Sequence, residues 1–154
     1  MQVPESGGPT PVRQAPLPVP APIEVGSFRL ASEDNVMITA SSGGKPLPGG
    51  MAHPIFGFVA AVGGLGIPIG DLLARHGGSI AAGPLLGRCA IRYEMPLKVG
   101  LTYQVSGEVE SVVRKRSRRF GETDHFTLRI DVGSGGQHYS SLTLTIIVPQ
   151  ETAI

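Results

Sequence analysis

The chain has 154 residues, of which 41% are hydrophobic, and its formal net charge is +1. A chain of this length and composition suits one globular domain with a sizeable core. The single cysteine excludes a disulfide framework or a cysteine-based metal site, and no apolar run approaches the ~20 residues of a membrane span.

Residues 1–22 hold half of the chain's 14 prolines. Proline fixes φ and lacks a backbone donor, so we expect a disordered or polyproline-like arm that joins neither a sheet nor a helix. The ordered domain should begin near Ile23 and cover 23–150, which leaves 151–154 as a short tail. A partner-binding role for 16–20 is the alternative to a plain tail.

The first elements of the domain are a short strand at 26–31 and a helix that begins at Ser32. Ser32 would cap this helix, Glu33 and Asp34 would occupy its first turn, and the run 41–44 would end it. A loop rich in glycine and proline then leads to Gly50.

A second helix is predicted at 55–62, because Pro54 suits the first turn and the residues after it are apolar nearly all round. Such a helix should be buried on every side. Its glycines, among them Gly57 and Gly64, each cost about 1 kcal/mol of helix propensity. We expect a closely approaching sheet to compensate for them.

Four later runs alternate between apolar and polar residues, as strands with one buried face do. They lie at 88–95, 101–110, 126–132 and 142–148. In the first run this alternation places Cys89 inward, as a small core residue, and Glu94 outward. Turn-compatible separators, including the basic stretch that ends at Thr123, make the four runs an antiparallel meander. The expected class is α+β, with an antiparallel sheet wrapped around one buried helix.

Three passages carry a resemblance to a known family. Residues 52–58 resemble the entry to the central helix of the MaoC-like dehydratases and (R)-specific enoyl-CoA hydratases, and residues 87–100 resemble their strand and "RPL-x-x-G-D" turn. Residues 28–44 resemble the opening strand and helix that lead to the active-site loop of this family. The likeness covers about 25–149 and implies the hot-dog fold. The turn departs at Leu101, where the family carries an aspartate.

Catalytic members of this family use an aspartate and a histidine to hold a water and to exchange a proton with the α-carbon of the substrate. Alignment on Pro54 places Met51 at the aspartate position, His53 at an asparagine position and Phe56 at the histidine position. A thioether and a phenyl ring cannot transfer protons. The chain therefore looks most like the non-catalytic, dehydratase-like half of the family.

Several residues at the start of the second helix are site candidates. His53 could act as a base near neutral pH or hydrogen-bond a carbonyl, or it could cap the helix locally. The resemblance implies that Met51, Phe56 and Gly57 line the substrate site. Free N–H groups after Pro54 would offer an oxyanion site for a thioester carbonyl.

The second candidate region is the basic stretch at 114–119. Arg114, Lys115, Arg116 and Arg118 could bind the phosphates of coenzyme A or the acidic face of an acyl carrier protein. A solvated hairpin that protects an edge strand is the alternative. Nucleic acid is disfavoured, because no stacking aromatics are interleaved with the basic residues. The pairs 124–125 and 138–139 flank the last hairpin and could face each other across strands as surface pairs.

The resemblance implies a subunit of an enoyl-thioester hydratase or 3-hydroxyacyl-thioester dehydratase that binds an acyl-CoA or acyl-carrier-protein thioester. Its Asp/His dyad would come from a partner hot-dog subunit. The alternatives are a non-catalytic homodimer that binds an acyl ligand and a hot-dog thioesterase, which would need a carboxylate near the helix. The N-terminus lacks the features of a signal peptide, so we expect a cytoplasmic protein, with neither metal nor cofactor.

Overall fold

The computed structural model describes residues 16–150, and residues 1–15 and 151–154 lie outside the description. Five strands and three α-helices make up this part of the chain, with two short 3₁₀ turns. In chain order the elements are β1 (Ala21–Arg29), α1 (Ser32–Ser41), η1 (Pro48–Gly50), α2 (Phe56–Gly63), α3 (Ile69–Arg75), η2 (Ile80–Ala82), β2 (Leu85–Tyr93), β3 (Thr102–Ser117), β4 (Gly121–Ser134) and β5 (Gln137–Pro149).

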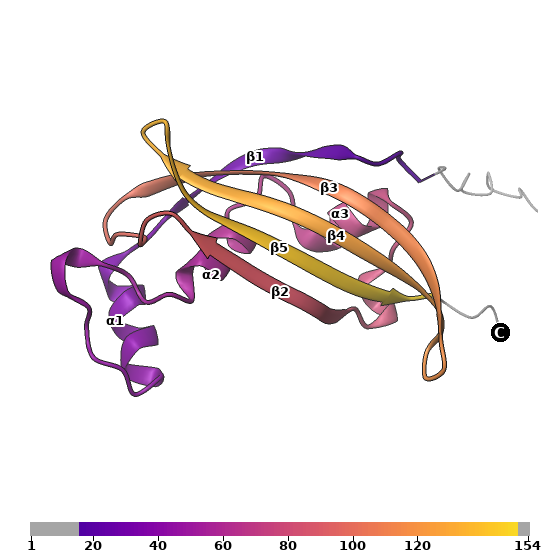
Figure 1. Ribbon diagram of the computed structural model, residues 1–154, viewed down its shortest axis with the longest axis horizontal. Helices are drawn as coiled ribbons and strands as arrows, with labels where there is room; N and C mark the ends of the chain where they lie inside the picture. The colour runs from indigo at the N-terminus through magenta and orange to yellow at the C-terminus, as the bar shows by residue number, and fades with distance from the viewer. Residues whose placement is uncertain (1–15, 151–154) are drawn as a thin grey trace, which may run out of the picture.

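The strands form one antiparallel sheet in the order β1-β3-β4-β5-β2. Helix α2 lies against one face of this sheet and contacts all five strands (Figure 1). The predicted meander holds only for β3, β4 and β5. Strand β2 pairs with β5 instead of β3, because the long crossover from β2 to β3 carries the chain across to the far side of the meander.

The core lies between α2 and the inner face of the meander. Leu128 and Ile130 on β4 and Leu144 on β5 are buried with Phe56 of α2, while the alternate residues of both strands face outward. The predicted period of two is therefore confirmed for β4 and β5. Each fully buried Leu or Ile of this kind contributes about 1.5–3 kcal/mol through removal of apolar surface from water.

Strand β2 keeps the alternation but not the burial. Cys89, predicted to be a core residue, is exposed, and Ile91 is only half-buried. The reason is topological: β2 is an edge strand, and α2 covers only part of its inner face, at Ile91 and Tyr93. Periodicity predicts which side chains share a face, and it does not predict what packs against that face.

Order begins earlier than predicted, because β1 starts at Ala21 and the Leu17 N–H donates to the Arg75 carbonyl at 3.0 Å. Pro22 belongs to β1, contrary to the expectation that the arm joins no sheet. An edge strand tolerates proline, since a missing N–H there removes no ladder bond on the free side. A register shift between Ile23 and Gly26 further bends this edge. The predictions for 1–15 and for the tail lie outside the described residues.

Three local expectations change. Helix α1 has Ala31 at its N-cap position with no side-chain cap, so Ser32 does not cap it. The basic stretch is not a turn, because β3 continues to Ser117 and only 118–120 connect it to β4. Helix α2 buries Phe56 and Ala60 but leaves Val59 half-exposed, so it is not buried on every side.

Gly64, the C-cap residue of α2, allows the close approach that was predicted. A Cβ at Gly64 would lie 2.5 Å from a Val105 methyl of β3, closer than real side-chain contacts allow.

None of the helices in residues 16–150 is long and apolar enough to span a membrane.

Candidate functional site

A small apolar pocket lies where the chain enters α2. Its volume is about 260 Å³, and it opens beside the end of edge strand β2. Its lining is almost entirely hydrophobic, with one imidazole and one phenol: Leu47, Met51, Ala52, His53, Pro54, Tyr93, Pro96 and Leu97. No side chain among these lining residues carries a carboxylate.

Two loops build the pocket and are held together by backbone bonds. The Ala52 N–H donates to the Leu97 carbonyl at 2.7 Å, and the Val99 N–H donates to the Gly50 carbonyl at 2.9 Å. Met51 and Lys98 form an isolated antiparallel bridge between these two bonds. The pocket floor is thus a rigid, two-stranded connection rather than a free loop.

His53 is half-buried and its ring is held on both sides. The Ile55 N–H donates to Nδ1 at 3.0 Å, and Nε2 lies 3.4 Å from the hydroxyl of Ser42. The His53 backbone N–H donates to Oδ1 of Asn35 at 2.8 Å. Because Nδ1 accepts a hydrogen bond, the neutral ring carries its proton on Nε2. This geometry is that of a local cap whose outer nitrogen is a donor.

Tyr93 joins β2 to the beginning of α2. Its hydroxyl accepts the Gly57 N–H at 3.1 Å and donates to the Pro54 carbonyl. A Cβ at Gly57 would lie 2.2 Å from this hydroxyl, so only glycine fits here without a shift of Tyr93. Burial raises the pKa of Tyr93, which keeps the phenol neutral as a donor.

The N–H groups at the start of α2 already have acceptors within the chain. Ile55 donates to the His53 ring, Phe56 to the His53 carbonyl at 3.0 Å, and Gly57 to both the Pro54 carbonyl and Tyr93. The expectation of free N–H groups after Pro54 is therefore wrong. A ligand carbonyl at Gly57 would take the place that the Tyr93 hydroxyl occupies.

The predicted site residues separate in the structure. Met51 and His53 line the pocket, whereas Phe56 is 1% exposed and packs in the core outside the lining. Gly57 is buried beneath Tyr93. Sequence reasoning missed Tyr93 as part of this site. Tyr93 belongs to the alternating run at 88–95, and that pattern predicted only that its side chain points inward.

The basic stretch occupies the opposite end of the sheet, where β3 and β4 form a hairpin that we call the basic hairpin (residues 114–124). Arg114 binds Asp124 through two bonds of 3.0 and 3.3 Å, and Gln150 also donates to Asp124. Arg116 lies 4.0 Å from Glu122. Lys115 and Arg118 are exposed and form no ion pair with any described residue.

A larger cavity of about 860 Å³ lies at the base of this hairpin. Asp124 and Arg114 line one side of it, and His76, whose Nδ1 is 3.1 Å from the Leu17 carbonyl, lines another. The Arg114–Asp124 pair and the His76–Leu17 bond both tie elements of this end together. We therefore interpret the polar groups of Arg114, Asp124 and His76 as structural contacts.

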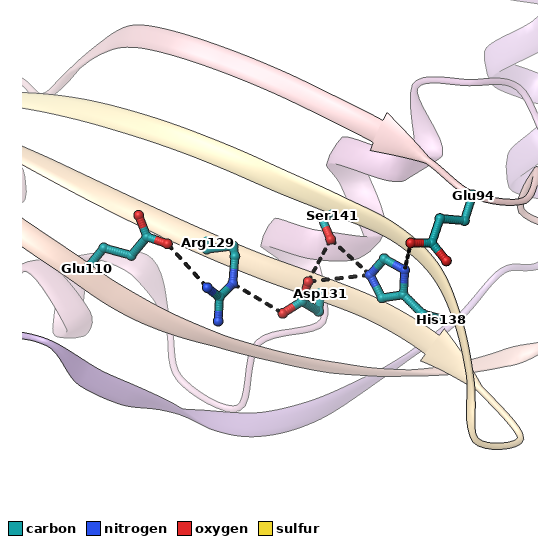
Figure 2. Close-up of polar contacts among 6 residues, drawn as sticks. All are labelled: Glu94, Glu110, Arg129, Asp131, His138 and Ser141. Carbon is teal, nitrogen blue, oxygen red and sulfur yellow. Dashed lines mark hydrogen bonds and ion pairs between the residues drawn. The ribbon is translucent and has the colours of Figure 1, made fainter.

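Outside the pockets, six residues form a polar network on the outer face of the sheet (Figure 2). His138 is central: Nδ1 is 3.3 Å from Glu94 and Nε2 is 2.9 Å from the Ser141 hydroxyl. That hydroxyl donates to Asp131 at 2.6 Å, and Arg129 links Asp131 to Glu110.

This network resembles a nucleophile–histidine–acid series, but its hydrogen bonds argue against that chemistry. The Ser141 hydroxyl donates to Asp131 at 2.6 Å, and Nε2 of His138 lies 3.4 Å from the same carboxylate, so the serine is bound to an acid as well as to the imidazole. The six residues line neither of the cavities above. We interpret the network as cross-strand surface pairing.

The expected contact between the pairs 124–125 and 138–139 is absent within the described sheet, because the register places them at opposite ends of β4 and β5.

Comparison with known proteins identifies the fold. No protein family profile and no curated sequence matches the chain. Among solved structures, the ChsH1–ChsH2 complex of Mycobacterium tuberculosis matches at 18% identity, over 86% of this chain and 85% of that chain, with a TM-score of 0.61.

Two further structures are named for an activity. The C-terminally truncated HadBC (3R-hydroxyacyl-ACP dehydratase) complex of Mycobacterium tuberculosis shares 12% identity over 81% of this chain and 95% of that chain, with a TM-score of 0.59. The R-hydratase PhaJ1 of Pseudomonas aeruginosa shares 18% over 88% and 84%, with a TM-score of 0.57. The chain therefore has the hot-dog fold, and the predicted α+β class is confirmed.

Proposed function

We propose that the chain is a MaoC-like hot-dog subunit that binds an acyl thioester of coenzyme A or an acyl carrier protein. The assembly would hydrate a 2-enoyl thioester reversibly to the 3-hydroxy form, with the water-activating Asp and His supplied by another subunit. One observation carries this proposal: an apolar pocket at the start of α2 opens at an unpaired sheet edge, and its lining holds no carboxylate.

Within this proposal the chain's own residues bind and orient the thioester. His53 donates through Nε2, and Met51 and Leu97 contact the acyl group in the pocket. The thioester carbonyl replaces the Tyr93 hydroxyl at the Gly57 N–H, a donor at the positive end of α2. Because Nδ1 of His53 already accepts a hydrogen bond, we assign His53 to carbonyl binding and not to proton abstraction.

The proposed partner contact is the free edge of β2. Leu86 and Tyr93 are exposed there. The N–H and C=O groups on the side of β2 away from β5 have no strand to pair with in residues 16–150. Two of the similar structures are named as complexes of two proteins, ChsH1 with ChsH2 and the HadBC complex. They support a partner subunit here, either a second copy or a catalytic hot-dog protein.

The binding step can be tested with S-hexyl-CoA, a thioether that cannot be hydrolysed. We expect saturable binding by calorimetry and thermal stabilisation of the chain, with no hydration of crotonyl-CoA by the purified chain. Leu47→Trp should fill the pocket and abolish binding, since Leu47 lines it and is 44% exposed, so a larger side chain costs little folding energy.

The matched control is Ile80→Trp, a similar exposed position outside the pocket lining, which should bind S-hexyl-CoA as the natural chain does. Absence of binding by the natural chain would refute the proposal. Hydration of crotonyl-CoA at an ordinary enzymatic rate would refute the requirement for a partner.

The absence of a carboxylate among the pocket's lining residues also favours a second candidate, a homodimer that binds an acyl ligand without turnover. The two candidates differ once a catalytic subunit is present. An adjacent gene that encodes an intact Asp and His motif, and whose product confers hydratase activity when mixed with this chain, supports the first. A hot-dog thioesterase ranks last, because it would need a carboxylate near the helix and the pocket lining holds none. Release of free coenzyme A from hexanoyl-CoA by the purified chain would restore the thioesterase as a candidate.

A further inference from the structure

One buried side chain beside the pocket has a polar group without a hydrogen-bond partner. Ser140 on β5 is 1% exposed, and its hydroxyl is the one fully buried side-chain polar atom in residues 16–150 that has no partner. A buried hydroxyl of this kind destabilises the folded chain, and native proteins contain few of them. A role in binding, in which a ligand supplies the missing partner, would account for this hydroxyl.

A β-bulge places Ser140 on the inner face of the sheet. Val132 of β4 pairs with Ser140, and the next residue of β4 pairs with His138. Tyr139 is therefore an extra residue of β5, and it is buried together with Ser140, whereas burial alternates along the rest of this strand. Ser141, the following residue, belongs to the outer network of Figure 2. Bulges often redirect side chains beside binding sites.

The other residue of the bulge is held by contacts with the loop that builds the pocket. The N–H groups of residues 94 and 95 both donate to the Tyr139 carbonyl, at 2.9 and 3.2 Å. The Tyr139 ring meets the Tyr103 ring edge-on at 5.1 Å, and the Lys98 N–H donates to the Tyr103 hydroxyl at 2.7 Å. Lys98 belongs to the bridge in the pocket floor. These contacts hold the bulge in place without the serine hydroxyl.

Tyr93 separates Ser140 from the pocket. The two residues are directly opposite on β2 and β5, so their Cβ atoms lie about 4.5–5.5 Å apart on the same face of the sheet. Tyr93 lines the pocket and Ser140 does not. The proposed contact between a thioester carbonyl and the Gly57 N–H requires the Tyr93 hydroxyl to leave this N–H. The same movement of the tyrosine would open the pocket toward Ser140.

The neighbours of Ser140 limit the chemistry of its partner. On the inner face it lies between Tyr93 of β2 and Val132 of β4, and Leu142 is buried two residues further along β5. A carboxylate or an ammonium group would be desolvated here without an opposite charge, which is costly. A hydroxyl or keto oxygen is neutral, and a serine hydroxyl can donate to either and accept from a hydroxyl.

We infer that Ser140 binds a neutral oxygen atom on the acyl chain and makes the pocket selective for acyl groups that carry a hydroxyl or keto group. This inference rests on the proposed function and adds the class of acyl group. Ser140 determines specificity and takes no part in proton transfer. An unsubstituted alkyl chain leaves the hydroxyl without a partner, so such a chain gains nothing from the serine.

A series of thioethers tests this selectivity by calorimetry. The series consists of S-hexyl-CoA and its analogues with one hydroxyl at carbon 3, 4, 5 or 6 of the hexyl chain. At least one hydroxylated analogue should bind Ser140→Ala about tenfold more weakly than the natural chain, through loss of one buried hydrogen bond. S-hexyl-CoA should bind the two chains equally. Equal binding of every hydroxylated analogue to the two chains would overturn the inference.

Thermal stability distinguishes a binding role from a structural one. Ser140→Ala should have a thermal midpoint at least as high as that of the natural chain, because it removes a polar group without a partner. Thr123→Val is the matched control, since Thr123 is also 1% exposed but its hydroxyl donates to the Lys115 carbonyl at 3.1 Å. This control should have a lower midpoint and an unchanged preference among the thioethers. A lower midpoint for Ser140→Ala would indicate a structural role and overturn the inference.

The inference and the proposed function fail in different ways. If the natural chain binds no member of the series, the proposed function fails, and the inference fails with it. If S-hexyl-CoA binds and no hydroxylated analogue distinguishes Ser140→Ala from the natural chain, the inference alone fails. S-(5-carboxypentyl)-CoA tests the requirement for a neutral oxygen, and it should bind the natural chain more weakly than S-hexyl-CoA. Equal or tighter binding of this carboxylate would overturn that requirement.

Discussion

Strands β4 and β2 show the same alternation of apolar and polar residues, yet they have opposite burial. In β4 the inward residues Leu128 and Ile130 are fully buried, whereas in β2 Cys89 is exposed and Ile91 half-buried. The difference lies in position, because β4 is central and β2 is an edge strand. Helix α2 covers only part of β2, so Leu85, Leu86 and Tyr93 stay exposed, as apolar residues do on surfaces that pack against another chain.

The largest effect should come from the central strand. Leu128 is 0% exposed, and Leu128→Ala should lower the free energy of unfolding by about 2–5 kcal/mol, through lost burial and the cavity that remains. Leu86→Ala on β2, where the side chain is 61% exposed, should change it by less than about 0.5 kcal/mol. Urea denaturation at low protein concentration measures both, and equal losses would contradict the comparison.

The contact that joins the edge to the core is the next test. Gly57→Ala places a methyl group against the Tyr93 ring and hydroxyl and should cost about 1–3 kcal/mol. Tyr93→Leu should relieve part of this loss, so that the double variant is more stable than the two single losses predict. Gly63→Ala is the control, because its Cβ meets only Phe28 at 3.8 Å. Strict additivity would show that Tyr93 does not oppose the methyl group.

Alkaline pH tests the same contact in another way. Burial raises the pKa of Tyr93 and of Tyr103 above the ordinary value of 10.0. The unfolded chain therefore releases these protons first, and stability that is complete below pH 10 should fall as the pH rises through the raised values. Tyr93→Phe should make the decline less steep in denaturation curves recorded between about pH 9 and 11. An unchanged slope would indicate a solvated phenol.

The smallest effect should come from the outer face. His138→Gln removes the centre of the network in Figure 2, whose side chains are partly exposed. Exposed ion pairs contribute about 0–1 kcal/mol, and salt screens them. The thermal midpoint of the variant should differ little from that of the natural chain, and less at 1 M salt than at low salt. A large loss would mean that the network holds the end of β2 in place.

Much of the fold was predictable because it depends on local rules. Proline before an apolar, glycine-bearing run predicted α2 to within one residue at each end, and the alternation predicted β4 and β5. The order of strands was not predictable in this way, because the placement of β2 beside β5 depends on a long crossover. Burial failed at Cys89 for the same reason, since it depends on neighbours distant in the chain.

The site was less predictable than the fold. Met51 and His53 could be placed at the pocket because they lie beside the start of α2, and the chain is continuous there. Tyr93 lies far from them in sequence, and only the β2–β5 register brings its hydroxyl to Gly57. The roles of Met51, Phe56 and Gly57 in substrate binding stay predictions. The roles of the basic side chains at 114–118 in binding coenzyme A or a carrier protein also stay predictions.

The two edges of the sheet differ in a way that limits how copies of this chain can associate. Strand β1 enters with Pro20 just before it and Pro22 within it, and its register shifts between Ile23 and Gly26. Missing donors make the β1 edge a poor template for another strand, whereas β2 contains no proline, although its own register shifts between Leu86 and Arg88. Strand addition between copies would therefore be limited to β2. A chain with only one such edge can form a closed pair but not an open-ended fibre.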